Sequence, residues 1–290
     1  MRRAAALALL CAASCAAPPA RSSASAENVL FVTIDGFRWQ EVFEGAEEAL
    51  LVKSNGADGA ELRKAFWRDT PEARREALLP FMWGVMAKEG QIFGNGKKNC
   101  AMRVTNGHSF SYPGYAEMLC GFADPRVDSN KKIPNPNVTV FEWLNGRSGF
   151  QGSVAAYCTW DVFPSILNRE RSGLVVHFGP PYGDARLDAL YGDLPALWHD
   201  CTVDALEFHA GMDYLKAKKP RVFYFAFGVS RSFLLALTFF MAAFQPLRAE
   251  RNPMGPALDQ CQEPGAADPI SPGAAEHAAE RRGDDDADQG

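Results

Sequence analysis

Two residues of this chain combine a reactive side chain with a position suited to catalysis. Asp35 directly follows the apolar, β-branched run NVLFVTI at 28–34. A carboxylate at the end of a buried parallel strand could bind a divalent cation or act as a base. Ser111 opens the segment SYPGYAEMLCG. A hydroxyl at the start of a helix lies beside backbone N–H groups and the positive end of the helix dipole, which favour a phosphate or an ionised nucleophile.

Each of these residues also has a purely structural interpretation. Asp35 could cap the turn that begins at Gly36, since Asp commonly bonds to nearby backbone in turns. Ser111 could be an ordinary N-cap, a more common use of serine at this position than nucleophilic catalysis. Position alone leaves both interpretations open.

The apolar pattern predicts strands that alternate with helices. Strands are predicted at 28–34, 152–157, 173–178 and 221–227, with a possible short strand at 91–93. Helices are predicted at 73–88, 111–119, 140–145 and 187–216. Thr70 as N-cap and Pro71 in the first turn mark the start of the first helix, and Gly121 marks the end of the second. Residues 122–138 are rich in Pro, Asn and Asp, which predicts a loop over the sheet edge. This order predicts an α/β fold over residues 27–228, with a mostly parallel sheet sandwiched by helices.

Two segments together resemble one enzyme family. The segment VLFVTIDGFRWQEVF at 29–43 is similar to the first strand and metal-binding Asp of the alkaline phosphatase superfamily, particularly its nucleotide pyrophosphatase/phosphodiesterase-like branch. The segment SYPGYAEMLCG at 111–121 resembles the Thr/Ser-x-Pro nucleophile helix of that branch. The resemblance implies an alkaline-phosphatase-like fold to about Gly228, with Asp35 as a ligand of one of two Zn²⁺ ions. It also implies that Ser111 is the metal-bound nucleophile toward a small phosphate mono- or diester.

The resemblance further implies an Asn that binds a phosphate oxygen, for which Asn130 and Asn106 are the two candidates. In such a site one cation activates the serine oxygen, and a second stabilises the leaving oxygen. Sulfatases of the same superfamily also have a Ser or Cys two residues before a Pro. Their maturation requires an Arg two residues after that Pro, where this chain has Tyr115. A phosphate ester is therefore the preferred substrate, and a sulfatase-like hydrolase is an alternative.

The sequence departs from the family pattern after Gly228. The family continues with an Asp, a His four residues later, an Asp-His pair and a last His, and none of these follows here. We therefore expect at most partial zinc binding, and we hypothesise a truncation or an altered reading frame after Gly228. The histidines at 108, 177, 199 and 209 are expected to be core or surface residues, not ligands. A non-catalytic remnant or binding module of the same fold is the second functional hypothesis.

Composition and the chain ends add four expectations. Residues 1–26 have a basic start, an apolar run and an Ala-x-Ala ending, which predicts a signal peptide and a secreted or periplasmic protein. Residues 229–290 are predicted to be an apolar segment followed by a disordered low-complexity tail. A membrane span over 222–244 is a third hypothesis, but Arg231 would cost about 2.5 to 3.5 kcal/mol within it. The net charge of -5, with scattered Lys and Arg, argues against nucleic acid as a partner.

Seven cysteines are present, of which five follow residue 26. Their odd number and the absence of a CxxC pair indicate neither a zinc ribbon nor a regular disulfide framework. Small buried hydrophobic residues with at most one or two bridges are the expected role.

Overall fold

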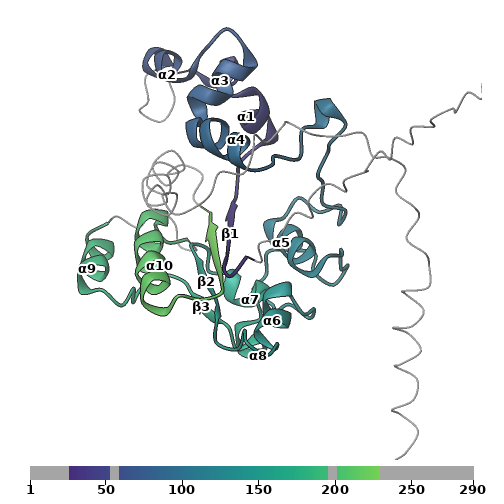
Figure 1. Cartoon of the computed structure of the whole chain (residues 1–290), viewed down its shortest axis with the longest axis vertical. Helices are drawn as coiled ribbons and strands as arrows, with labels where there is room; N and C mark the ends of the chain where they lie inside the picture. Colours follow the sequence, from purple (N-terminus) through teal and green to yellow (C-terminus); the bar gives the residue numbers. More distant parts are fainter. Residues whose placement is uncertain (1–25, 53–58, 195–200, 229–290) are drawn as a thin grey trace, which may run out of the picture.

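Four parallel strands form the centre of the protein (Figure 1). The computed structural model describes residues 26–52, 59–194 and 201–228. Within these residues the sheet has the order β1-β4-β2-β3, and all three neighbouring pairs are parallel. The predicted α/β class is therefore confirmed, with the strands β1 (Val29–Ile34), β2 (Val154–Cys158), β3 (Val175–His177) and β4 (Val222–Phe227).

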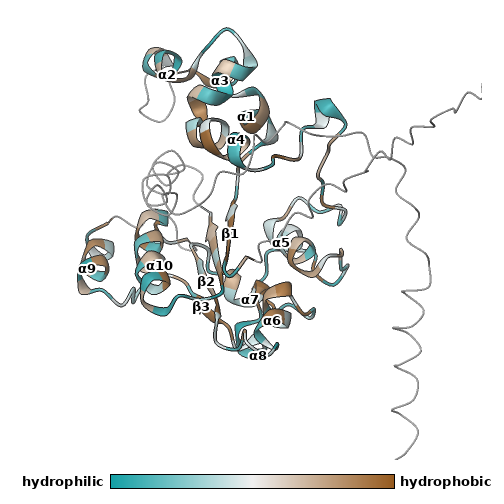
Figure 2. Cartoon of the chain, in the orientation of Figure 1, coloured by the Kyte–Doolittle hydropathy of each residue, from teal (hydrophilic) through white to brown (hydrophobic). Residues whose placement is uncertain are grey.

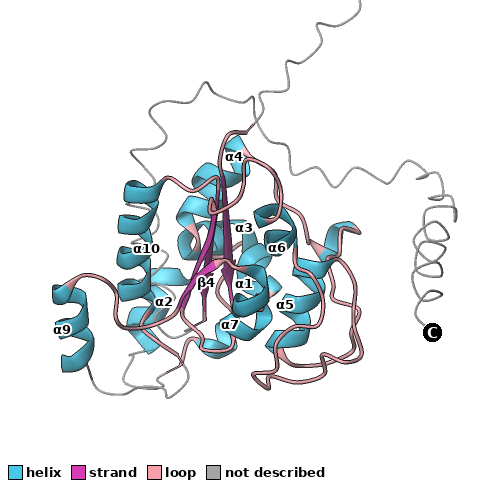
Figure 3. Ribbon diagram, turned by 90° about the horizontal axis from the view of Figure 1, so that it is seen from below, coloured by secondary structure: helices cyan, strands magenta, loops and turns pink. Residues whose placement is uncertain are grey.

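Helices cover both faces of the sheet, as expected where both faces of a parallel sheet are buried. Along β4 the side chains alternate, so that Tyr224 and Ala226 face one core cluster, and Phe223 and Phe225 face the other. Figure 3 shows the strands between α10 on one side and α5 and α6 on the other. The first face packs against α5 (Ser111–Cys120), α6 (Val140–Asn145) and α7 (Phe163–Ile166), and the second against α9 (Ala185–Asp193) and α10 (Asp204–Lys218).

Strand β1 is made mostly of apolar residues (Figure 2). A separate group of helices follows it in the chain. Phe43, Leu79 and Trp83 form its buried core, and the Trp83 indole donates a hydrogen bond of 2.9 Å to the Val42 carbonyl. Its elements are α1 (Trp39–Glu44), η1 (Glu48–Leu50), α2 (Gly59–Phe66), α3 (Pro71–Leu78), the π-helix η2 (Met82–Met86) and α4 (Ala87–Glu89). Two further short helices complete the described part, η3 (Gly96–Lys98) and α8 (Arg169–Ser172).

The prediction of one helix over 73–88 was wrong. The helix that Thr70 caps ends at Leu78, and Leu79 takes non-helical angles before the chain becomes helical again. Pro80 explains this break, because a proline disfavours the helical conformation of the residue before it. The possible strand at 91–93 was also wrong, since these residues form no strand and Ile92 packs against the helical cluster instead.

The prediction of one continuous helix over 187–216 was wrong. This segment belongs to two helices, α9 and α10, and residue 194 has extended backbone angles. Leu194 precedes Pro195, so the same restriction on the residue before a proline applies here.

The predicted helix ends at Thr70 and Gly121 are confirmed. The Thr70 hydroxyl accepts a hydrogen bond of 3.2 Å from the Ala73 N–H, with Pro71 in the first turn. Gly121 ends α5 in the left-handed conformation with φ of 83°, which glycine adopts without strain. The predicted loop at 122–138 and the helix at 140–145 are also confirmed.

Several predictions concern residues outside the described ranges. The signal peptide at 1–26 and the tail at 229–290 fall there almost entirely, so both stay predictions. The membrane span over 222–244 was wrong for its first six residues, because Val222–Phe227 is strand β4, buried between two neighbours. Among the described helices, none has the length and apolar character that crossing a bilayer requires.

Candidate functional site

A cavity of about 670 Å³ lies where β1 ends and α5 begins, and it brings Asp35 and Ser111 to one place. This volume is within the range of small-molecule sites. The end of β1 contributes Thr33, Ile34 and Asp35 to its lining. Helix α5 and the loop before it contribute the opposite wall, namely Ser111, Gly114, Tyr115, Glu117 and Met118 with Met102, Arg103 and Val104.

Strand pairing fixes the position of Asp35. The six residues of β1 pair in register with β4, and the Asp35 N–H extends this ladder with a bond of 2.9 Å to the Phe227 carbonyl. The side chain then turns back, and its Oδ1 accepts a hydrogen bond of 2.6 Å from the Gly36 N–H. Gly36 has a φ of 71°, a conformation that costs glycine little. Asp35 therefore has both a turn-capping contact and a place in the cavity.

The start of α5 determines the position of Ser111. Phe110 is the N-cap residue and gives no side-chain cap, so Ser111 is the first residue of the helix itself. The interpretation of Ser111 as an ordinary N-cap was therefore wrong. Its hydroxyl makes no hydrogen bond with any described residue and lines the cavity. A hydroxyl in this position is available to a ligand.

The hydroxyl groups of Thr33 and Tyr115 belong to residues that line the cavity. Tyr115 is buried against Phe163, with ring centroids 4.8 Å apart. Burial raises the pKa of Tyr115 well above its ordinary value, and the charge of Asp35 raises it further. The Thr33 and Tyr224 hydroxyls are hydrogen-bonded at 2.8 Å. Tyr115 is thus a neutral hydroxyl beside the Asp35 carboxylate.

Asn130, one of the two candidate phosphate ligands, lies at the N-terminus of α5. Its Oδ1 accepts a hydrogen bond of 3.0 Å from the N–H of Tyr112, the residue after Ser111. Its Nδ2 group makes no hydrogen bond with a described residue. The Tyr112 hydroxyl also donates to the Ile133 carbonyl at 2.8 Å. The loop 122–138 is therefore attached to the helix start at two points.

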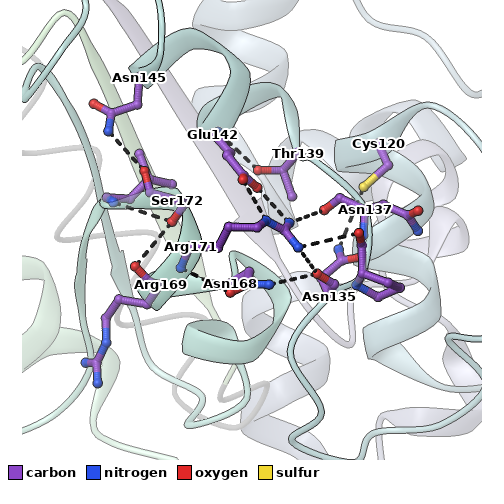
Figure 4. A network of polar contacts seen from close by, with 12 residues as sticks. Cys120, Asn135, Asn137, Thr139, Glu142, Asn145, Asn168, Arg169, Arg171 and Ser172 are labelled. Atoms are coloured by element: carbon purple, nitrogen blue, oxygen red, sulfur yellow. Dashed lines mark hydrogen bonds and ion pairs between the residues drawn. The ribbon is translucent and has the colours of Figure 1, made fainter. Parts of the chain in front are cut away.

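Arg171 fixes the other end of this loop (Figure 4). Its guanidinium makes two hydrogen bonds, of 2.7 and 2.8 Å, with the two carboxylate oxygens of Glu142. It also donates to the carbonyls of Asn135 and Asn137 at 2.9 and 2.8 Å. Such a two-point pairing of Arg with a carboxylate fixes orientation as well as distance. The loop that bears Asn130 is consequently anchored to α6 and α8.

Asn106, the other candidate, is occupied by a contact with α5. The Glu117 carboxylate accepts four hydrogen bonds, from the backbone N–H and side chain of Thr105 at 2.6 and 2.8 Å and from those of Asn106 at 3.0 and 2.8 Å. The Asn106 Oδ1 accepts from the His108 N–H at 2.8 Å. Neither Asn106 nor Asn130 is among the residues that line the cavity. Its described contacts are those of a residue that shapes a loop.

The described residues alone do not fit the two Zn²⁺ ions that the resemblance implies. A catalytic zinc takes three protein ligands. Asp35 and Glu117 are the acidic residues that line the cavity, and four donors already occupy Glu117. No group of three or more His, Cys, Asp or Glu side chains that could hold a metal occurs in the described ranges.

The described histidines and cysteines have other environments. His177 pairs with the buried Glu207, with 2.6 Å between Nδ1 and Oε1. His209 is exposed on α10 and His108 is half-buried, whereas His199 is outside the described residues. Cys100 is disulfide-bonded, and the Cys158 thiol is completely buried.

Comparisons with protein-family models, with curated proteins and with solved structures found no match to this chain. The chemistry of the cavity therefore has to be inferred from its own residues. Sequence reasoning found Asp35 and Ser111 but assigned no role to Arg103 or to Glu117, although Glu117 lies within the SYPGYAEMLCG segment. The spacing gave no signal for Glu117, because residues six positions apart do not share a helix face.

Proposed function

We propose that the protein is a hydrolase of small phosphate esters, of the alkaline phosphatase type, with Ser111 as its nucleophile. The observation that supports this proposal best is that Asp35 and Ser111, 76 positions apart in the sequence, line one cavity. The free hydroxyl at the start of a ten-residue helix supports it further, since such a position stabilises a phosphate.

In this reaction the Ser111 oxygen forms a bond to phosphorus, and the bond between phosphorus and the ester oxygen breaks. Asp35 takes the hydroxyl proton of Ser111 and then donates this proton to the ester oxygen, so that the alcohol leaves and the Asp35 carboxylate is restored. Water then attacks the phosphoserine, gives one proton to Asp35 and, through it, to the Ser111 oxygen, which restores the hydroxyl and releases phosphate from a monoester or a phosphate monoester from a diester. Tyr115 stays neutral because it is buried, so its hydroxyl can donate a hydrogen bond.

A second candidate function is a phosphate-binding module without turnover. The shortage of metal ligands in the described ranges favours it, because the family that the sequence resembles depends on two metal ions. The two functions share one site and differ in whether the phosphoserine forms and is hydrolysed.

Replacement of Ser111 tests the proposal. With a chromogenic phosphodiester, we expect Ser111→Ala to reduce turnover at least about a hundredfold, because the attacking oxygen is removed. Ser109→Ala is the matched control, since Ser109 is exposed, lies two residues earlier and does not line the cavity. Equal turnover by wild type and Ser111→Ala would contradict a serine nucleophile. Phosphate binding without turnover would identify the binding module, and turnover of an aryl sulfate alone would identify a sulfatase.

A further inference from the structure

Arg103 is the one cationic side chain among the described residues that line the cavity. It is exposed, and its guanidinium makes no hydrogen bond or ion pair with any described residue. Arg126, Arg171 and Arg186 are, by contrast, each paired with a carboxylate. An unpaired guanidinium beside a proposed phosphate site is available to bind an anion, because its planar N–H groups match phosphate oxygens.

The loop that bears Arg103 is tied to the nucleophile helix by Glu117. The four hydrogen bonds to the Glu117 carboxylate come from Thr105 and Asn106, two and three residues after Arg103. Val104 contacts α5 as well, since its Cγ1 lies 3.9 Å from the position a Cβ would take at Gly114. The loop 102–106 is thus held against the helix that begins with Ser111.

This contact also changes the electrostatics of the cavity. Two backbone N–H groups and two side-chain donors neutralise much of the Glu117 charge, so this carboxylate repels an anion less than an unpaired one would. Burial raises the pKa of Glu117, but these donors lower it by more, which keeps the carboxylate ionised and able to accept all four bonds. Asp35 and Arg103 then remain as the two charges that face a ligand.

We propose that residues 102–106 form a substrate-binding arm, in which Arg103 binds a phosphoryl oxygen of the ester and Glu117 is the positioning residue that holds the arm. This inference rests on the proposed function, because it places the phosphoryl group between Ser111 and Arg103. It assigns to the arm the recognition of an anion, separate from the attack at phosphorus. Met102 and Val104, which are exposed at the same wall, provide apolar contact for the alcohol part of the ester.

Binding of 1-naphthyl phosphate to the full chain, measured by calorimetry, tests Arg103. We expect Arg103→Gln to weaken binding about tenfold, because one charge-assisted hydrogen bond to the phosphoryl group is lost. Arg169→Gln, which removes the same charge from an exposed position on α8, is expected to bind as the wild type does. Trypsin cleavage after Arg103 provides a second measurement, and we expect bound ligand to slow it.

The role of Glu117 is tested with a double-mutant cycle, in which the effects of Glu117→Gln and Arg103→Gln on ligand binding are compared. We expect Glu117→Gln to weaken binding to a similar extent, because the amide keeps one acceptor oxygen but its NH2 group cannot accept, so two of the four hydrogen bonds from Thr105 and Asn106 are lost. If Glu117 acts through the arm, the double variant binds no more weakly than Arg103→Gln alone, whereas independent effects would add. Amide hydrogen exchange at residues 105 and 106 is expected to become faster in Glu117→Gln, with unfolding elsewhere unchanged.

The possible failures are distinguishable. If the wild type binds 1-naphthyl phosphate and Arg103→Gln binds it equally well, the arm is overturned and the proposed function stands. If the effects of Arg103→Gln and Glu117→Gln add fully, Glu117 is not the positioning residue. If the wild type binds no phosphate ester, the arm and the proposed function are both wrong.

Discussion

The half-buried His177 and the buried Glu207 form a pair on the face of the sheet opposite α5. Glu207 is completely buried in α10, and its second oxygen accepts a hydrogen bond of 3.2 Å from the Gly179 N–H. His177 also bonds to the Pro181 carbonyl at 3.0 Å and stacks on Tyr157, with ring centroids 4.6 Å apart. This pair ties the loop after β3 to α10 and is remote from the proposed nucleophile.

The protonation of this pair makes stability depend on pH. Burial lowers the pKa of His177, but the hydrogen bond and charge of Glu207 raise it by more, so it lies above 6.5. Burial raises the pKa of Glu207 above 4.5, and His177 only partly offsets this. Both groups therefore bind protons more tightly in the folded than in the unfolded protein. Their contribution is fully present below the ordinary pKa values and is lost as pH rises through the raised ones.

We expect the free energy of unfolding to fall as the pH rises above 6.5, the ordinary pKa of His177, with a slope of up to about 1.4 kcal/mol per pH unit for each extra proton held. Urea unfolding at a series of pH values measures this slope. The double variant His177→Gln with Glu207→Gln keeps polar side chains at both positions but removes both titrations, so its slope is expected to be flatter. An unchanged slope in that variant would attribute the pH dependence to other groups.

At the residue scale, sequence and structure agree where a short motif specifies a position. The strand ending in Asp35 and the helix beginning with Ser111 were both predicted, because each lies at the boundary of a strongly patterned element. Arg103 and Glu117 were not predicted. Their relationship depends on how the loop 102–106 folds against α5, and no local pattern of apolar residues encodes that contact.

At the element scale, the packing of α10 on the sheet depends on one glycine. A Cβ added at Gly211 would lie 2.6 Å from Cζ of Phe225 and 3.2 Å from Cγ of Tyr157. Glycine at this position therefore allows the helix to approach β4 and β2 closely. Glycine inside a helix costs about 1 kcal/mol relative to alanine, so its presence here is explained by packing.

We expect Gly211→Ala to lower the free energy of unfolding by about 1 to 2 kcal/mol, since the overlap with Phe225 exceeds the gain in helix propensity. Gly192→Ala in α9 is the matched control. Nothing lies within 4 Å of a Cβ at Gly192, so alanine is expected to stabilise there by up to about 1 kcal/mol. Chemical denaturation of the two variants compares them directly. Stabilisation by Gly211→Ala would mean that α10 lies farther from the sheet.

Helix boundaries were predicted less well than helix existence. The helical spacing of apolar residues continues across Leu79-Pro80 and across Leu194-Pro195, but the backbone does not stay helical at either place. Apolar spacing records which side chains are buried. The proline restriction acts on the backbone of the preceding residue and is independent of burial. Apolar spacing and proline positions together predict two helices in each segment.

At the scale of the whole molecule, the sequence predicted the class of the fold but not its sheet order. Four strands with intervening helices indicate parallel pairing, because parallel neighbours require crossover connections. The insertion of β4 between β1 and β2 is set by long-range packing of its two apolar faces, which local patterns do not reveal. This order brings the ends of β1 and β4 together next to α5.

The number of zinc ions that the protein binds depends on the metal ligands that this strand order places at the cavity. Two carboxylates line the cavity, those of Asp35 and Glu117. Glu117 already accepts four hydrogen bonds, whereas Asp35 accepts one, from the Gly36 N–H. We therefore expect the purified chain to retain fewer than two zinc ions after dialysis, because three protein ligands are needed for each catalytic zinc. Elemental analysis of wild type and of Asp35→Asn measures this. Two ions per chain, reduced by Asp35→Asn, would contradict the expectation and show that residues beyond the described ranges complete a metal centre around Asp35.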